Sequence, residues 1–312
     1  MNILIMTAAM ALAGSSIAVS KNLTESMPVF LANELSLLIA WLVLLPFGIR
    51  HFRSHFRRIG STLQASSLRT LLYWPALQAL FGMALFRALT FFGLRHVSAI
   101  EGALLTATTP AVMAMLAYFL LGEKPHAKRM AGIVLAVSGV LALNWQAGIR
   151  IHSVTGFALI LLATACESLL TIFRRMATTP IPPLANTFYI VSFSIIFLLP
   201  ALFIENEWKT LPLLTTSQWL GCLYLGVVAT ALAYLCWGYA STRIDANLTG
   251  IITAVMPFSG ALISVIWLRE TFFVRHVVGA IFIISSILVN VRLFPSPVWR
   301  ERKHRRIDES TR

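Results

Sequence analysis

Ten long apolar runs occupy most of this 312-residue chain, and each has the length of a membrane-crossing helix. A helix needs about 20 mainly apolar residues to cross the hydrocarbon core of a bilayer. The runs cover residues 3–20, 29–49, 70–93, 97–121, 128–144, 154–173, 183–204, 218–238, 246–268 and 274–293. The chain is therefore predicted to be an all-α integral membrane protein with ten transmembrane helices.

Composition excludes the soluble alternative. Hydrophobic residues make up 58% of the chain and charged residues 12%. A soluble domain carries about a quarter charged residues, and this chain has too few to cover the apolar surface.

The three cysteines, Cys166, Cys222 and Cys236, lie inside apolar runs and form no CxxC pair. They are interpreted as small apolar filler, so neither a disulfide framework nor a metal site is expected.

The first run resembles a signal peptide in length, and Ala11, Ala13 and Gly14 resemble the small residues of a cleavage site. However, no basic residue precedes Lys21, so the basic region that opens a signal peptide is missing. Residues 3–20 are therefore interpreted as a retained first span.

The net charge of +13 follows the pattern of membrane orientation. Basic residues lie between the runs and in the tail, which disfavours a nucleic-acid-binding face. With a cytoplasmic N-terminus, the cytoplasmic segments hold 18 Lys and Arg, the opposite side holds 6, and Arg87 lies within a run. The chain is therefore predicted to be a multi-pass protein of the cell membrane, which in a bacterium is the inner membrane. Both termini are predicted to be cytoplasmic.

Two stretches, residues 96–140 and 243–287, resemble each other without a gap. Pro110 matches Pro257, Glu123 matches Glu270, and Gly132 matches Gly279, each pair 147 residues apart. The prolines could be kinks and the glutamates simple helix ends, but a repeat explains both at once. Five spans per unit is an odd number, so the units 1–147 and 148–294 are predicted to be inverted repeats. A basic cytoplasmic tail, 295–312, follows them.

The ten runs, the two units and the stretches TPAVMAMLAYFLLGEK (109–124) and MPFSGALISVIWLRE (256–270) resemble the drug/metabolite transporter superfamily, EamA type. The second stretch departs from the pattern, because Arg269 stands where the first has Gly122. The resemblance implies a basket-like bundle whose central cavity is lined by spans one, three, four, six, eight and nine, with spans five and ten at the periphery. It also implies a small-molecule substrate such as an amino acid, a related metabolite, a nucleotide sugar or a drug.

Four ionisable residues lie within runs and are candidate substrate-binding residues: Glu34, Arg87, Glu101 and Glu167. A charged side chain at the centre of a bilayer costs roughly 3 kcal/mol on insertion scales, so such residues mark functional sites. Arg87 either binds substrate or is only neutralised by Glu34 or Glu101. Glu101 has a third interpretation as a water-exposed helix end. Glu167 has no cation beside it in sequence, so it either carries a proton or forms an interhelical hydrogen bond.

Tyr234 and Trp237 are aromatic candidates for the substrate site, since aromatic rings bind apolar or cationic groups. An interfacial belt is the alternative, favoured for Tyr239. Tyr234 lies 147 residues after Arg87, so both are expected near the pseudo-symmetric centre. Pro110 and Pro257 are interpreted as hinges, with static bends as the alternative. Gly132, Ala136 and Gly139 form a small-residue stripe suited to close helix packing.

The function predicted from these features is secondary transport by alternating access, with export of a small polar or amphipathic metabolite favoured over uptake or exchange. The chain has no GxSxG, HExxH or Walker motif, which argues against a membrane-embedded enzyme and an ATP-driven pump. A receptor without transport is a further alternative. No cofactor is expected, and the expected partners are the lipid bilayer, the substrate, and a proton or counter-substrate.

Overall fold

The computed structural model describes residues 1–59, 65–121, 127–144, 151–177, 181–241, 243–244 and 252–291, and helices are the only regular elements in these ranges. The α-helices are α1 (Asn2–Ser26), α2 (Val29–Ile59), α3 (Ala65–Ala79), α4 (Phe86–Leu94), α5 (Ala99–Thr106), α6 (Thr109–Leu121), α7 (Ala127–Asn144), α8 (Ile151–Met176), α9 (Pro183–Ile204), α10 (Thr216–Leu223), α11 (Ala233–Ser241), α13 (Val255–Trp267) and α14 (Val274–Val291). Two π-helical segments, η1 (Leu80–Leu85) and η3 (Tyr224–Leu232), and one 3-10 segment, η2 (Glu207–Leu213), complete the set. The predicted tail and Gly122, Glu123 and Lys124 lie outside the described residues.

Six helices of the described ranges are long and apolar enough to cross a membrane. They cover Asn2–Ser26, Val29–Arg50, Leu72–Leu94, Val154–Arg174, Pro183–Ile204 and Thr216–Ala240. Helices α5 and α6 are each too short, and they pass the same test only when taken together as one span, which is bent by 41° at the break between them. The other apolar helices, Met130–Leu143, Val255–Trp267 and Val274–Val289, are shorter. An all-helical protein with several membrane spans is confirmed, whereas the count of ten stays a prediction.

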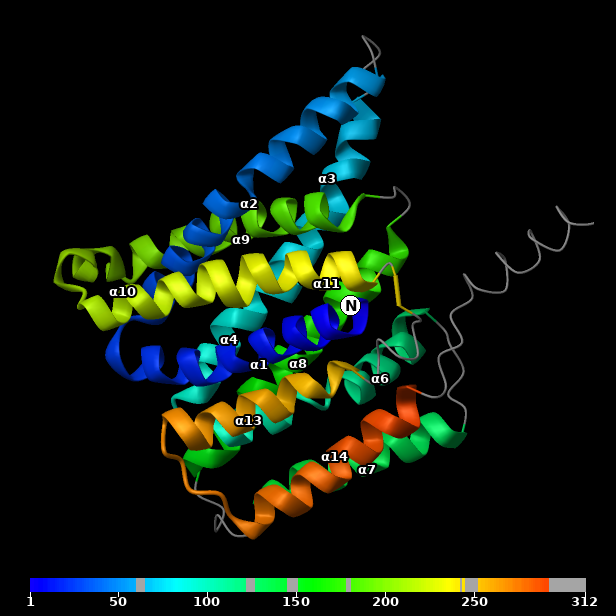
Figure 1. Ribbon diagram of the computed structural model, residues 1–312, viewed down its shortest axis with the longest axis vertical. Coiled ribbons are helices and arrows are strands. Elements are labelled where there is room, and N and C mark those ends of the chain that lie inside the picture. Colours follow the sequence, from blue (N-terminus) through cyan, green and yellow to red (C-terminus); the bar gives the residue numbers. More distant parts are fainter. Residues whose placement is uncertain are drawn as a thin grey trace, which may run out of the picture.

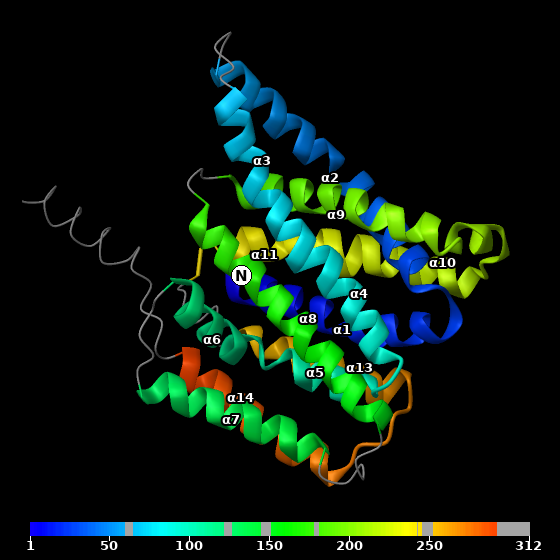
Figure 2. The same cartoon turned by 180° about the vertical axis from the view of Figure 1, so that it is seen from behind.

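The helices form one bundle with two distinct edges (Figure 1). Helices α2, α3 and α9 lie along one edge and the pair α7 and α14 along the other, in both views (Figure 2). Between these edges, α1 packs against α11 and α13, and α8 packs against α4 and α6. Helices α1 and α9 end, and α2 and α5 begin, at the same end of the bundle, left in Figure 1, which we name the Glu270 end.

Glycine permits the closest helix contact in the bundle interior. A Cβ on Gly14 of α1 would lie 2.0 Å from the backbone oxygen of Met256 in α13. On the facing helix, a Cβ on Gly260 would lie 2.9 Å from the Cβ of Ala103 in α5 and 3.0 Å from the Gly14 oxygen. Helices α1 and α13 therefore meet backbone to backbone, where only glycine fits, and α5 packs on Gly260 through the Cβ of Ala103.

The small residues of α7 face α14, in agreement with the packing interpretation. A Cβ on Gly139 would lie 3.1 Å from the oxygen of Gly279. Seven residues away, the Ser286 hydroxyl donates to the oxygen of Gly132 at 2.6 Å. Ala136, between the two glycines, is buried. Small side chains thus hold α7 and α14 together along one face.

Both candidate hinge prolines lie at helix starts. Pro110 is the second residue of α6, just after the break at residues 107–108, and Pro257 is the third residue of α13, just after the turn at Ala254. The first helical turn has no intrahelical acceptor for its N–H groups, so proline costs little there. Ala107 and Ala254 are 147 residues apart, the same interval that separates the two prolines.

Candidate functional site

Arg87, near the start of α4, lies at the meeting point of α2, α4 and η3. Its Nε donates to Asn33 Oδ1 at 2.9 Å, and its Nη2 donates to Ser36 Oγ at 2.6 Å. Its Nη1 donates to Thr230 Oγ1 at 3.3 Å. Asn33 and Ser36 are three residues apart and share one face of α2, so one helix presents both acceptors. The described hydrogen bonds of the Arg87 guanidinium thus all go to neutral side-chain oxygens of α2 and η3.

Both π-helical segments adjoin this arginine. Segment η1 ends at Leu85, two residues before Arg87, and Thr230 lies within η3. The Thr230 hydroxyl donates its hydrogen to the backbone oxygen of Leu225, five residues earlier, at 2.7 Å. Its lone pairs therefore remain available to accept from Arg87. Such π-helical segments are frequent at functional sites because they turn side chains away from the regular helical face.

Glu34 lies beside these acceptors on α2 and is 1% exposed. Neither carboxylate oxygen has a hydrogen-bond partner in the part of the chain that the structure describes. Arg87 interacts with Glu34 electrostatically, but its hydrogen bonds go to neutral oxygens. The Thr90 hydroxyl, three residues after Arg87, is equally buried and without a described partner. One interpretation of the sequence is that Arg87 is only neutralised by Glu34. A direct bond between these two side chains is not formed in the structure.

Glu167 and Tyr234 form the adjoining part of the site. Tyr234 interacts electrostatically with Arg87, Glu167 and Arg174, so three of the predicted residues share one region. Thr109, the first residue after the helix break, has its hydroxyl 2.9 Å from Glu167 Oε2. The interhelical hydrogen bond considered for Glu167 is therefore present, and it joins α8 to the break.

Trp237 lies one turn beyond Tyr234, and the guanidinium carbon of Arg174 stands 5.2 Å from the centroid of its ring. One ring face is thus already covered by a cation. Tyr239 is 42% exposed, as an interfacial belt residue would be.

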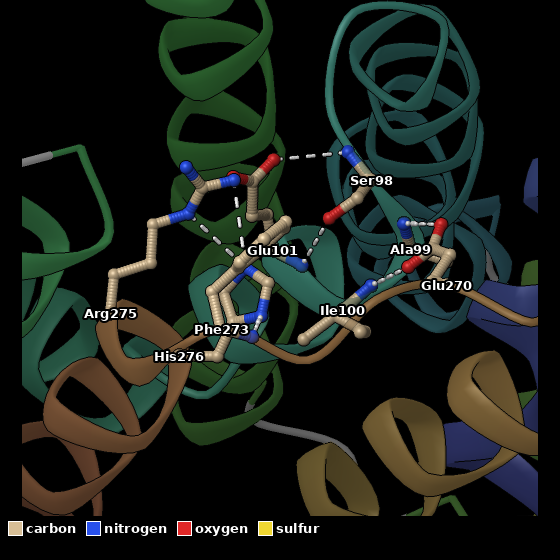
Figure 3. Close-up of polar contacts among 8 residues, drawn as sticks. All are labelled: Ser98, Ala99, Ile100, Glu101, Glu270, Phe273, Arg275 and His276. Carbon is tan, nitrogen blue, oxygen red and sulfur yellow. Dashed lines mark hydrogen bonds and ion pairs between the residues drawn. The ribbon is translucent and has the colours of Figure 1, made fainter. Parts of the chain in front are cut away.

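Glu101 lies in a different cluster, at the Glu270 end (Figure 3). Its Oε2 accepts from the backbone N–H of Ser98 at 3.0 Å, and the Ser98 hydroxyl accepts from the N–H of Glu101 at 3.1 Å. This is a capping box at the start of α5. The other oxygen of Glu101 lies 3.4 Å from Arg275 Nη2. Glu101 is therefore paired with Arg275, and the pairing with Arg87 considered from the sequence is not formed.

The same view shows a second carboxylate acting on the same helix start. Glu270 Oε1 accepts from the N–H of Ala99 at 2.7 Å, and Oε2 accepts from the N–H of Ile100 at 2.9 Å. His276 accepts from the N–H of Phe273 through Nδ1 at 3.2 Å, and its Nε2 lies 4.0 Å from Glu101 Oε1. Glu270, between α13 and α14, and Arg275 and His276, in the first turn of α14, therefore meet the start of α5.

Sequence reasoning missed the residues that hold Arg87, namely Asn33, Ser36 and Thr230. The polar residues Asn33, Glu34 and Ser36 do interrupt the second apolar run, which is a usable signal. For Thr230 no signal exists, since threonines are common in membrane helices and bond to their own backbone.

Comparison with known proteins finds transporters among the relatives of this chain. The chain is 33% identical over 290 residues to the uncharacterized transporter YetK of Bacillus subtilis, covering 92% of this chain and 85% of that protein. It is 26% identical to the biotin transporter of Escherichia coli K12, covering 84% of this chain and 86% of the relative. It is 26% identical to a probable terminal-alkyne amino-acid exporter of Streptantibioticus cattleyicolor, covering 68% of this chain and 70% of that protein.

One solved crystal structure aligns with 94% of this chain and 99% of the chain in that structure, at 20% sequence identity and a TM-score of 0.58. At this identity the likeness shows the fold alone. The model of the EamA-like transporter family matches the chain twice, over residues 1–145 and 154–292. Together these matches span nearly the whole sequence. The chain therefore belongs to the EamA-like transporter family.

Proposed function

We propose that this transporter exports a small polar or amphipathic metabolite, such as an amino acid or a derivative, by alternating access. The observation that carries the proposal is Arg87, a cation held inside the bundle by Asn33, Ser36 and Thr230. An ionisable residue at such depth is costly and marks a substrate pathway. The related exporter and biotin transporter support a small-molecule cargo.

The chemistry of Arg87 supports a substrate that carries a carboxylate. Amino acids and biotin, the molecules named for two relatives, share this group. A guanidinium binds a carboxylate through two parallel N–H donors, and this charge-assisted bond is stronger than bonds to neutral oxygens. A carboxylate can therefore displace the neutral acceptors. Glu34, whose oxygens have no described partner, and the ring of Tyr234 complete the proposed site, with Trp237 at its edge.

The architecture that fits this function is ten spans in two inverted repeats, residues 1–147 and 148–294, followed by the tail 295–312. The match of the family model to each half supports it. The 147-residue interval also makes α7 and α14 equivalent in position. These helices begin at Ala127 and Val274 and end at Asn144 and Val291. Pro110 and Pro257 are proposed as equivalent hinges of the two halves.

Topology offers a first prediction. With both termini cytoplasmic, a reporter fused after Arg312 and one inserted in the loop 205–209 should report opposite sides of the membrane. The reason is the basic asymmetry of 18 against 6. Enzyme-activity reporters in intact cells measure this directly, and reports from the same side would refute the topology.

Glu167 is the proposed proton carrier. The Thr109 hydroxyl lies 2.6 Å from the Thr106 oxygen as well as 2.9 Å from Glu167. A hydroxyl has one hydrogen, so when it serves Thr106 the carboxyl must supply the hydrogen for the second contact. A protonated Glu167 satisfies both contacts at the break.

Glu167→Gln is therefore expected to fold normally and to export at a rate that no longer responds to a pH gradient, because an amide donates a hydrogen but does not titrate. Flux in vesicles with and without a gradient measures this. Glu25→Gln, at an exposed carboxylate, serves as the control and should respond as wild type does. A wild-type response in Glu167→Gln would remove this residue from the coupling proposal.

Comparison of metabolites inside and outside cells with and without the gene tests export itself. Export predicts that one metabolite class accumulates inside cells that lack the gene. Depletion inside those cells would favour uptake, and unchanged gradients with a changed ratio of two metabolites would favour a membrane-embedded enzyme.

A further inference from the structure

We propose that Glu270 and Arg275 form a latch that closes the Glu270 end of the bundle by holding the first turn of α5. The latch consists of Glu270, Arg275 and their targets Ala99, Ile100 and Glu101 (Figure 3). Releasing it opens that end of the substrate pathway. The inference rests on alternating access, but the latch contacts themselves do not involve the proposed substrate site.

The first turn of α5 has a local cap and a distant one. The first N–H groups of a helix have no intrahelical acceptor. Ser98 and Glu101 satisfy two of them within the turn itself. Glu270 satisfies the N–H groups of Ala99 and Ile100 from about 170 residues away in sequence. Because the local cap already starts the helix, the added effect of Glu270 is to join the segment between α13 and α14 to α5.

Arg275, the second residue of α14, adds a second tie to the first turn of α5. It approaches Glu101 at 3.4 Å, and Glu101 is 8% exposed. Ala99 and Ile100 are fully buried, so these contacts lie where water is scarce and hydrogen bonds are strong. On separation, the carboxylates and N–H groups would be hydrated from outside. The closed and open arrangements both satisfy the polar groups, which is what a reversible latch requires.

The shape of α5 explains why it can move. It is an eight-residue helix, held by the latch at its start and followed by the break at residues 107–108, where the direction changes by 41°. A short helix with a break at one end and side-chain contacts at the other can swing as a unit. Its inner face packs against Gly260 of α13 through Ala103, so opening would part α5 from α13.

Backbone strain lies next to the latch. Arg269 has φ 54°, in the left-handed region that favours glycine, and the N–H of Glu270 returns to the oxygen of Ser264 at 3.3 Å. This conformation directs Glu270 back toward α5 at a cost that glycine would not incur. Glycine at this position should therefore strengthen the latch, and loss of the Glu270 charge should weaken it.

The test uses a single reporter cysteine beneath the latch. Cys166, Cys222 and Cys236 are replaced by Ala, and Thr106→Cys, at a residue 6% exposed near the end of α5, is the reporter. The predicted topology places the Glu270 end outside the cell. A membrane-impermeant maleimide is therefore added outside intact cells, and labelling of folded, membrane-inserted protein is followed over time. No substrate is needed, so failure of the latch can be distinguished from failure of the proposed export.

Glu270→Gln is expected to raise the labelling rate roughly three- to tenfold, the range expected when a charged cap is lost. Arg269→Gly should lower the rate, and Glu205→Gln, an exposed carboxylate at the same end, should leave it unchanged. The Arg269→Gly arm keeps the proposal testable if Glu270→Gln folds poorly. Equal labelling in all variants, with only thermal stability altered, would show that Glu270 is a static cap and overturn the latch.

Discussion

Arg87→Gln is expected to reduce export by roughly a hundredfold or more while the protein still folds and accumulates. The glutamine retains a donor for Asn33 or Ser36, so the helix contacts persist. What is lost is the charge-assisted, two-donor bond to the substrate carboxylate, which is worth several kcal/mol when desolvated. Initial rates in vesicles, normalised to protein abundance, measure the effect.

The control for this prediction is Arg95→Gln, since Arg95 is exposed at the end of α4 and lies over the ring of Phe92. It should export normally. If Arg87 has only a structural role, Arg87→Gln will accumulate poorly and a second change, Glu34→Gln, will partly restore it. Full export by Arg87→Gln would contradict both interpretations.

Gly14→Ala is expected to destabilise the protein by about 3 kcal/mol or more, near the upper limit of the usual overpacking cost. The added Cβ would lie 2.0 Å from the backbone oxygen of Met256, and a backbone atom cannot rotate away as a side chain can. Helices α1 and α13 would have to separate along their contact. Thermal unfolding in detergent measures the loss.

A matched substitution is available in α11. Gly238→Ala places a Cβ no closer than 3.4 Å to its neighbours, an ordinary contact, and alanine favours helix by up to about 1 kcal/mol. It should leave stability unchanged or raise it slightly. Equal losses at Gly14 and Gly238 would mean that the α1–α13 contact does not limit stability.

Much of the fold is predictable from the sequence because lipid leaves few alternatives. Apolar runs of membrane-crossing length must be helical. The predicted runs 97–121 and 246–268 continue through Pro110 and Pro257, however, and only the structure shows that a helix starts just before each proline. The repeat also pairs Glu123 with Glu270, but it does not reveal what Glu270 binds. The departure at Arg269 has no reason in the sequence alone. The structure does not explain it either, because Arg269 has φ 54°, in the left-handed region where glycine is favoured.

The candidate site is predictable only in part. Burial cost singles out Arg87, Glu34 and Glu167 from sequence alone. Their partners come from elsewhere in the chain: Thr230 lies 143 residues from Arg87, and Thr109 lies 58 from Glu167. Glu101 shares their position in an apolar run, but its partner Arg275 belongs to a different helix. Hydropathy describes depth in the membrane and does not say which helices are neighbours.

Flux across a sealed bilayer tests the central claim most directly. The purified chain is reconstituted into proteoliposomes loaded with a mixture of labelled amino acids and other small carboxylates, and efflux is followed by filtration. The account predicts efflux of at least one carboxylate well above that from empty liposomes, and efflux at the empty-liposome rate for Arg87→Gln at equal reconstitution. Carboxylate efflux that is the same for wild type, Arg87→Gln and empty liposomes would contradict it.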